Sequence, residues 1–128
     1  MGIAFNHTIV QARDRRESAE FLSDLFGLAA PSSYGPFAVV ELDHGASLDY
    51  VQVPSGTEIH PQHYAFLVSD EDFDAIYGRI RESGLDHWAD PFHSQPGEIN
   101  HNDGGRGVYF PDPCGHNLEI ITVPYGGN

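Results

Sequence analysis

The stretch GVYFPDPCGHNLEIIT, residues 107–122, predicts two β-strands on either side of a turn. Two prolines and a glycine indicate the turn, and the branched apolar residues after it are typical of a strand over 117–123. Glu119 interrupts that strand. Because side chains alternate between the two faces of a strand, Glu119 shares its face with Ile121 and Val123. A carboxylate on such a face must be paired, protonated or bound to a cation.

Part of this stretch recurs earlier in the chain. GHNLE at 115–119 and GASLD at 45–49 share the pattern G-x-x-L-acid, with an offset of 70 residues. His7 and His63 are 56 apart, and the dipeptides GL at 27–28 and 84–85 are 57 apart. A long loop over 91–106, which only the second half contains, explains the larger offset. A ferredoxin-like fold would also suit the length, but the matched offsets favour an internal duplication.

In each half of the chain, the sequence pattern predicts a strand, a capped helix and at least two further strands. We therefore expect an α+β fold with two βαβββ units, residues 1–54 and 61–125, within a single domain over 1–128. The units would form a curved, mixed half-barrel sheet with the helices on its outside. The expected elements are strands at 3–10, 37–42, 47–53, 63–68, 107–110 and 117–123, and helices from Asp14 to Gly27 and from Ser69 to Gly84.

Composition narrows the class of protein. A chain of 128 residues suits one compact domain, and 40% hydrophobic residues exclude a disordered chain. A net charge of −13 with six basic residues argues against nucleic acid or a membrane surface as partner. No apolar run could span a bilayer, and the N-terminus shows no leader. The single cysteine, Cys114, excludes a disulfide framework, so we expect a cytoplasmic protein.

Four residues with metal-binding side chains stand at equivalent points of the repeat. Each unit begins with a strand histidine and ends with a strand acid, and a duplicated sheet would bring His7, Asp49, His63 and Glu119 toward one concave surface. Singly, each could be a satisfied core residue. Together, two imidazoles and a carboxylate form the set that holds Fe(II) with open coordination positions. A divalent cation would also keep Glu119 ionised.

The role of Asp49 has two interpretations. It could ligate the metal beside Glu119, or its shorter side chain could fall short and hydrogen-bond locally. Four protein ligands suit Lewis-acid proton transfer, whereas three leave room for a bidentate substrate and dioxygen.

With these residues, and with INHNDGGRGVYFPDPCGHNLE at 99–119, the chain resembles the vicinal oxygen chelate superfamily over nearly its whole length. That superfamily includes glyoxalase I, bleomycin-resistance proteins and extradiol ring-cleavage dioxygenases. The match is closest to single-domain extradiol dioxygenases, whose signature is a histidine, a spacer, an apolar residue and tyrosine, then Asp-Pro-x-Gly and a ligand glutamate. The matching residues here are His101, Val108, Tyr109, Asp112, Pro113, Gly115 and Glu119.

The resemblance implies a function. His7, His63 and Glu119 would bind Fe(II), or Mn(II), and a catecholic substrate would chelate the ion next to O₂. Tyr109 would hydrogen-bond a substrate oxygen, and His101 would lie on the lip of the pocket and orient the substrate. A homodimer is expected by the same analogy.

Two departures from the pattern leave other functions open. The first unit reads DHGASLDYVQ at 43–52, with Ser47 and Asp49 where such dioxygenases usually carry a further histidine, and with His44 displaced into the turn. The chain also has a single pair of units, whereas many such dioxygenases carry an additional pair. The alternatives are a glyoxalase- or epimerase-type enzyme using Ni(II), Zn(II), Co(II) or Mn(II), and a resistance protein that sequesters an aromatic natural product without catalysis. His116 is expected to face solvent.

Overall fold

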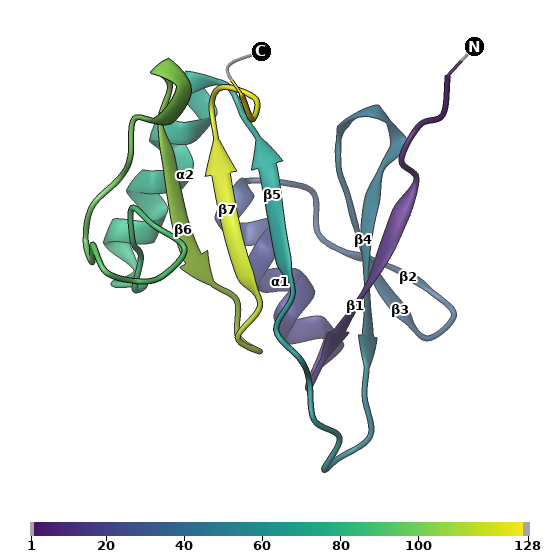
Figure 1. The fold of residues 1–128 in the computed structure, drawn as a ribbon. Coiled ribbons are helices and arrows are strands. Elements are labelled where there is room, and N and C mark those ends of the chain that lie inside the picture. The colour runs from purple at the N-terminus through teal and green to yellow at the C-terminus, as the bar shows by residue number, and fades with distance from the viewer. Residues whose placement is uncertain (1, 127–128) are drawn as a thin grey trace. The chain divides into compact units, whose positions relative to one another are not determined.

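The computed structural model describes residues 2–126, and the chain divides into two compact units between Ile59 and His60 (Figure 1). The first unit contains a sheet with the strand order β1–β4–β3–β2, in which β1 and β4 are parallel and the other neighbours antiparallel. Helix α1 packs on β3, β4 and β1. The elements are β1 (His7–Ala12), α1 (Arg15–Phe26), β2 (Ser32–Tyr34), β3 (Phe37–Glu41), the 3₁₀ turn η1 (Asp43–Gly45) and β4 (Ser47–Gln52).

The second unit repeats this plan with a sheet of order β5–β7–β6. Strand β5 runs parallel to β7, and β6 is antiparallel to it. Figure 1 shows α2 on one side of this sheet. The elements are β5 (His63–Leu67), α2 (Asp70–Glu82), the 3₁₀ turn η2 (Asn102–Gly104), β6 (Gly107–Pro111) and β7 (Asn117–Ile121).

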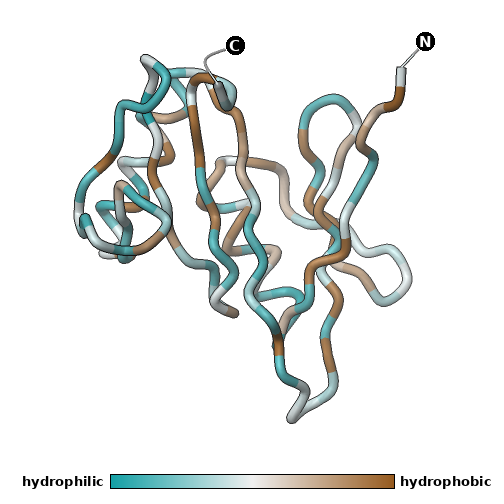
Figure 2. Tube along the Cα trace, viewed as in Figure 1, coloured by the Kyte–Doolittle hydropathy of each residue, from teal (hydrophilic) through white to brown (hydrophobic). Residues whose placement is uncertain are grey.

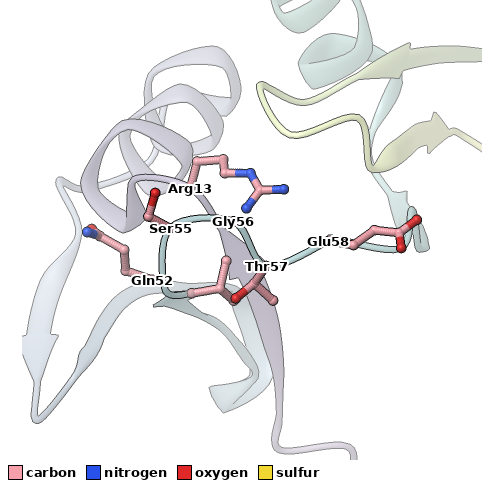
Figure 3. Close-up of a pocket in the computed structure, with 7 residues that line it drawn as sticks. Arg13, Gln52, Ser55, Gly56, Thr57 and Glu58 are labelled. Atoms are coloured by element: carbon pink, nitrogen blue, oxygen red, sulfur yellow. The ribbon is translucent and has the colours of Figure 1, made fainter.

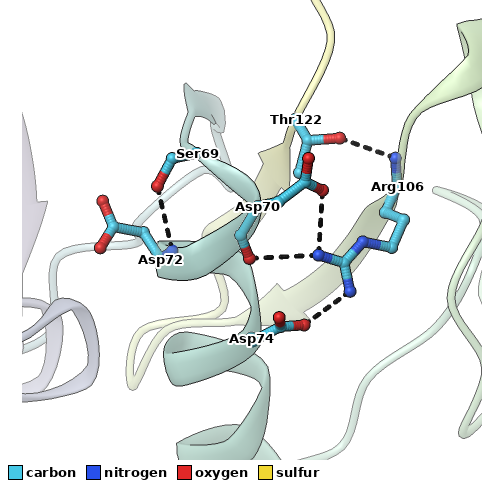
Figure 4. Close-up of polar contacts among 6 residues, drawn as sticks. All are labelled: Ser69, Asp70, Asp72, Asp74, Arg106 and Thr122. Carbon is cyan, nitrogen blue, oxygen red and sulfur yellow. Dashed lines mark hydrogen bonds and ion pairs between the residues drawn. The ribbon is translucent and has the colours of Figure 1, made fainter.

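The helices begin and end where their capping residues predict. The Asp14 carboxylate accepts hydrogen bonds from the backbone N–H groups of Arg16 and Glu17, and Gly27 ends α1 in the left-handed conformation at φ 69°. In α2 the hydroxyl of Ser69 accepts from the N–H of Asp72 (Figure 4). The boundaries of both helices are therefore encoded locally.

Alternation along the strands separates a buried face from an open one. Strand β1 buries Val10 and Ala12 and exposes His7, Ile9 and Gln11, so the face that carries His7 is the open one. Figure 2 shows polar and apolar residues interleaved along both units. Within residues 2–126, no helix is long and apolar enough to cross a membrane. The buried hydrophobic residues include Val10, Leu22, Val40, Leu48 and Tyr50 in the first unit and Phe73, Ile80, Val108, Phe110 and Ile120 in the second.

The predicted α+β class and paired units are confirmed, with local differences. Strand β1 begins at His7 rather than at residue 3, because its partner β4 begins at Ser47, directly opposite. The βαβββ pattern requires a third strand after the helix, but the residues of β2 were not predicted. Its three exposed residues show no apolar alternation, and the edge of β3 supplies its pairing. In the second unit, isolated bridges from Trp88 and Asn100 occupy the corresponding edge of β6. That both units form one domain stays a prediction.

An arginine attaches β6 to α2 within the second unit (Figure 4). The guanidinium of Arg106 donates to Asp74 Oδ1 at 2.7 Å and to Asp70 Oδ1 at 3.0 Å, and it stacks over the ring of Phe73 at 4.5 Å. The hydrogen bonds to Asp74 and then Asp70 raise the pKa of Arg106. Its backbone N–H donates to Thr122 Oγ1 at 2.9 Å. These contacts hold the backbone and the side chain of Arg106, three residues before Tyr109 on the same segment.

Candidate active site

The two histidine–acid pairs occupy the same diagonal in their respective sheets. In the parallel pair β1–β4, His7 lies opposite the residue two positions before Asp49. In the parallel pair β5–β7, His63 lies opposite the residue two positions before Glu119. The equivalence inferred from sequence offsets is therefore reproduced in strand register.

In the second unit the pair is assembled. His63 Nε2 lies 2.9 Å from Glu119 Oε1, and the Glu119 side chain is only 8% exposed, whereas that of His63 is 48% exposed. Tyr109 lies directly opposite Glu119 across β6–β7, and its ring centroid is 6.0 Å from that of His63. Three of the six predicted site residues thus converge.

Tyr109 is held as a hydrogen-bond donor. Burial, followed by its hydrogen bond to Glu119 and the charge of that carboxylate, raises the pKa of Tyr109 well above its ordinary value of 10.0. Tyr125 and Asp90 add smaller effects in the same direction. The phenol therefore remains protonated at neutral pH and can donate its proton to an oxygen.

In the first unit, His7 and Asp49 have local partners. His7 Nδ1 lies 2.6 Å from Asn6 Oδ1, so a hydrogen on Nδ1 orients the ring and leaves Nε2 as the nitrogen with a lone pair. The Ser47 hydroxyl donates to Asp49 Oδ1 at 2.7 Å, and Asp49 is half-buried. Within residues 2–126, no three His, Cys, Asp or Glu side chains converge on one point. The metal set and the ligand role of Asp49 stay predictions.

A recess of about 100 Å³ adjoins Tyr109 and Glu119 in the second unit. Its other lining residues come from the long loop, β7 and the segment that follows. His101 itself is exposed and does not line the recess, so its role stays a prediction. The further lining residues are Asn100, Asn102, Asp103, Arg106, Ile121, Val123 and Tyr125.

Asn100 is a site residue that sequence reasoning missed. Its amide donates to the carbonyl of Ala89 at 2.8 Å and accepts from the N–H of Asn102 at 3.1 Å, while its backbone pairs with Gly107. A Cβ on residue 107 would lie 2.9 Å from Asn100 Oδ1, so only glycine leaves room for the Asn100 side chain to pack against the start of β6. A glycine at the start of a predicted strand was the available signal.

The loop before Asn100 is itself ordered by side chains. The Asp90 carboxylate accepts from the N–H groups of Ser94 and Gln95 and from the Ser94 hydroxyl, and these hydrogen bonds, that of the hydroxyl above all, lower its pKa. The rings of Trp88 and His93 stack with centroids 3.6 Å apart. Trp88 also exchanges two backbone hydrogen bonds with Tyr109. The loop is thus tied to the strand that carries the phenol.

The expectation that His116 faces solvent is wrong. His116 is 1% exposed, and its Nδ1 accepts from the N–H of Gln62 at 3.0 Å. The turn before β7 folds back on Asp112, which carries the ring inward.

A larger hollow lies in the first unit and contains none of the predicted site residues. It measures about 510 Å³ and is formed by the turn after β4 together with Arg13 and Gln52 (Figure 3). In the described part of the chain, this hollow brings together no three metal-binding side chains.

Comparison with known proteins shows the family of the chain. Residues 4–120 match the model of the Glyoxalase/Bleomycin resistance protein/Dioxygenase superfamily. The glutathione transferase FosA of Serratia marcescens is 28% identical over 123 residues, 91% of this chain and 79% of that protein. The metallothiol transferase FosB of Shouchella clausii is 36% identical over 61 residues, 47% of this chain and 37% of that protein.

Two solved structures are more similar. Oxidase ChaP-H1 is 62% identical with a TM-score of 0.94, covering 98% of this chain and 100% of that one. Oxidase ChaP-H2 is 61% identical with a TM-score of 0.95, covering 100% of both chains. With a family match that spans nearly all of its residues, this chain belongs to the Glyoxalase/Bleomycin resistance protein/Dioxygenase superfamily.

Proposed function

We propose that this chain is a divalent-metal enzyme that oxidises a catecholic aromatic substrate with dioxygen, by dioxygenase-like cleavage. The convergence of His63, Glu119 and Tyr109 carries the proposal, because it combines two metal-binding side chains with a protonated donor. The similarity of the whole chain to two proteins named oxidases supports oxygen chemistry over other reactions of the superfamily.

The residues fit a divalent metal. The carboxylate of Glu119 is almost completely buried, and it lies next to His63 Nε2, an atom that commonly binds metal ions. We propose His7 as the third ligand, since it matches His63 in register and its ring leaves Nε2 for coordination. Such a set suits Fe(II) first and Mn(II) next. When bound, the ion would polarise the substrate oxygens and bring dioxygen next to them.

The chain's own groups would then position the substrate. The hydroxyl of Tyr109 keeps its proton and donates it to Glu119 in this structure. With Glu119 bound to a metal, the same proton would be donated to a substrate oxygen instead and would hold that oxygen beside the carboxylate. The recess offers an apolar side formed by Ile121 and Val123. His101, exposed on the neighbouring loop, would orient the far side of the substrate or accept its proton. By family analogy, we also propose a homodimer.

A non-redox reaction is the second candidate. Asp49 stands at the position equivalent to Glu119, and a fourth ligand would favour transferase or glyoxalase-type chemistry. The relatives named FosA and FosB are transferases. If Asp49→Ala sharply weakens metal affinity, this candidate is favoured over the first.

Oxygen uptake tests the proposal. Protein purified without an affinity-tag metal is analysed for its metal content, loaded anaerobically with Fe(II) and mixed with O₂ and a panel of catechols. We expect substrate-dependent O₂ consumption that Glu119→Gln abolishes and Tyr109→Phe slows. Glu41→Gln, an exposed acid at the end of β3, is the matched control. Stoichiometric iron without O₂ consumption across the panel would overturn oxidative cleavage.

A further inference from the structure

We propose that His116 is a positioning residue for the metal-binding pair: its buried imidazole holds Gln62 in place and so fixes His63 beside Glu119. This inference rests on the proposed function, because His116 would position two residues of the proposed metal site. His116 does not touch the substrate or the reacting atoms; it acts through the backbone.

The contact occurs at the first residue before β5. His116 is 1% exposed, and its Nδ1 accepts the backbone N–H of Gln62 at 3.0 Å. The carbonyl of Gln62 accepts from the N–H of Asn117 at 2.8 Å. Both backbone polar groups of Gln62 are therefore held by two consecutive residues, directly before His63.

The backbone of His116 is fixed by a tight turn, and its ring packs against a neighbouring ring. The buried carboxylate of Asp112 accepts from the N–H of His116 at 2.9 Å and from that of Cys114 at 2.8 Å. The N–H of Asp112 donates to the carbonyl of His116 at 3.0 Å, which closes the turn. The ring of Tyr64 meets the imidazole edge-on, with centroids 6.1 Å apart. Rotation of the ring away from Gln62 would break this packing.

The position of Gln62 matters because β5 is an edge strand. Among the residues that the structure describes, β5 has β7 as its single neighbour in this sheet, so the hydrogen bonds at its first residues determine where His63 lies. The hydrogen bond from Gln62 to His116 adds a side-chain contact one residue before the β5–β7 pairing begins at His63. Without it, the start of β5 would fray, and the 2.9 Å approach of His63 Nε2 to Glu119 Oε1 would be populated less often.

Two variants of His116 separate the acceptor from the bulk of the ring. His116→Phe keeps a ring without an acceptor, whereas His116→Asn places a carbonyl oxygen near the position of Nδ1. In metal-free protein, we expect amide exchange at Gln62 to accelerate about tenfold in His116→Phe and to stay near the wild-type rate in His116→Asn. Mn(II) affinity, measured by calorimetry, should fall about tenfold in His116→Phe and be largely retained in His116→Asn.

Controls decide between positioning and general loss of stability. Ile76→Val, in the buried face of α2, weakens the core elsewhere in the unit and should leave Mn(II) affinity unchanged. If His116→Phe fails to fold, His116→Leu, which is smaller and also lacks an acceptor, replaces it. Unchanged Gln62 exchange in the variant without the acceptor, or an equal loss of affinity in Ile76→Val, would overturn the inference. Wild-type protein that binds no Mn(II) would overturn the proposed function, while the exchange rates would still decide whether His116 fixes the strand.

Discussion

Replacing Glu119 by glutamine tests whether the buried carboxylate serves function or stability. The substitution keeps the volume of the side chain and leaves an amide oxygen that can still accept from Tyr109. It removes the negative charge, which makes a carboxylate a much stronger ligand for a divalent cation than a neutral amide. We expect the metal-free variant to fold with nearly wild-type stability and to lose most of its response to metal.

The magnitude follows from the contacts of Glu119. The contact with His63, whose side chain is 48% exposed, contributes about 0–1 kcal/mol to the free energy of unfolding. A charged acceptor for the Tyr109 hydroxyl contributes about 1 kcal/mol more than a neutral one. Removing a buried charge relieves a desolvation cost of comparable or larger size. These effects oppose each other, so the net change should be about 1 kcal/mol or less.

With metal present, the variant and the wild type diverge. At a free Mn(II) concentration about 100-fold above the dissociation constant, binding stabilises the wild type by about 2.7 kcal/mol. If loss of the carboxylate raises that constant about 100-fold, the same concentration stabilises the variant by only about 0.4 kcal/mol. For a domain of this size, the difference corresponds to about 7 °C in Tm.

Thermal unfolding with and without Mn(II) measures both quantities, and Glu41→Gln again serves as control. A metal-free Glu119→Gln protein destabilised by more than about 3 kcal/mol would mean that the carboxylate is a structural ion-pair member. An undiminished Tm increase with Mn(II) in that variant would mean that Glu119 is not a ligand. Either result would refute the reasoning.

Three further predictions concern the second unit and the first helix. Burial and Glu119 raise the pKa of Tyr109, so the phenol ionises at lower pH in the unfolded chain than in the folded one. The stability that this phenol contributes is therefore complete below about pH 10 and lost as the pH rises further. In urea titrations, the free energy of unfolding of Tyr109→Phe should fall less steeply above that pH than that of the wild type. Arg106→Gln should lower the free energy of unfolding by about 1–2 kcal/mol, because it loses the hydrogen bonds to Asp74 and Asp70 and the stacking over Phe73. An Asp74→Asn background should reduce that effect in a double-mutant cycle. Asp14→Ala should cost about 1 kcal/mol, visible as a lower urea midpoint, whereas Asp14→Ser should restore most of it.

Sequence patterns predicted the parts of the fold that local chemistry determines. Both helices begin at a capping side chain, and α1 ends at a left-handed glycine, so their boundaries could be read from Asp14, Gly27 and Ser69. The repeat offsets predicted equivalent registers for the histidines and the acids, and the strand pairing confirms them. Local signals were sufficient because each of these features involves neighbours in the chain or a copied pattern.

Tertiary pairing determined the rest. Strand β2 exists because β3 offers an open edge, which its own three residues do not reveal. His116 is buried because the Asp112 turn carries it inward, although its neighbours read as a solvated turn. The closure of Asn100 over Gly107 joins a loop to a strand and has only a weak sequence signal. Such contacts arise from the fold as a whole.

The differences between the two units bear on the number of metal ligands. Tyr109 lies opposite Glu119 in the second unit, whereas Val39 lies opposite Asp49 in the first and can donate no hydrogen bond. Ser47 instead satisfies Asp49 from its own strand, at 2.7 Å. The carboxylate of Asp49 is one methylene shorter than that of Glu119, so it reaches less far toward a cation. This favours three protein ligands over four, and three leave the open positions that oxidation of a bidentate substrate requires. Asp49→Ala should therefore change Mn(II) affinity less than about threefold, while Glu119→Ala lowers it by about 100-fold; equal losses in calorimetry would favour the four-ligand, non-redox enzyme.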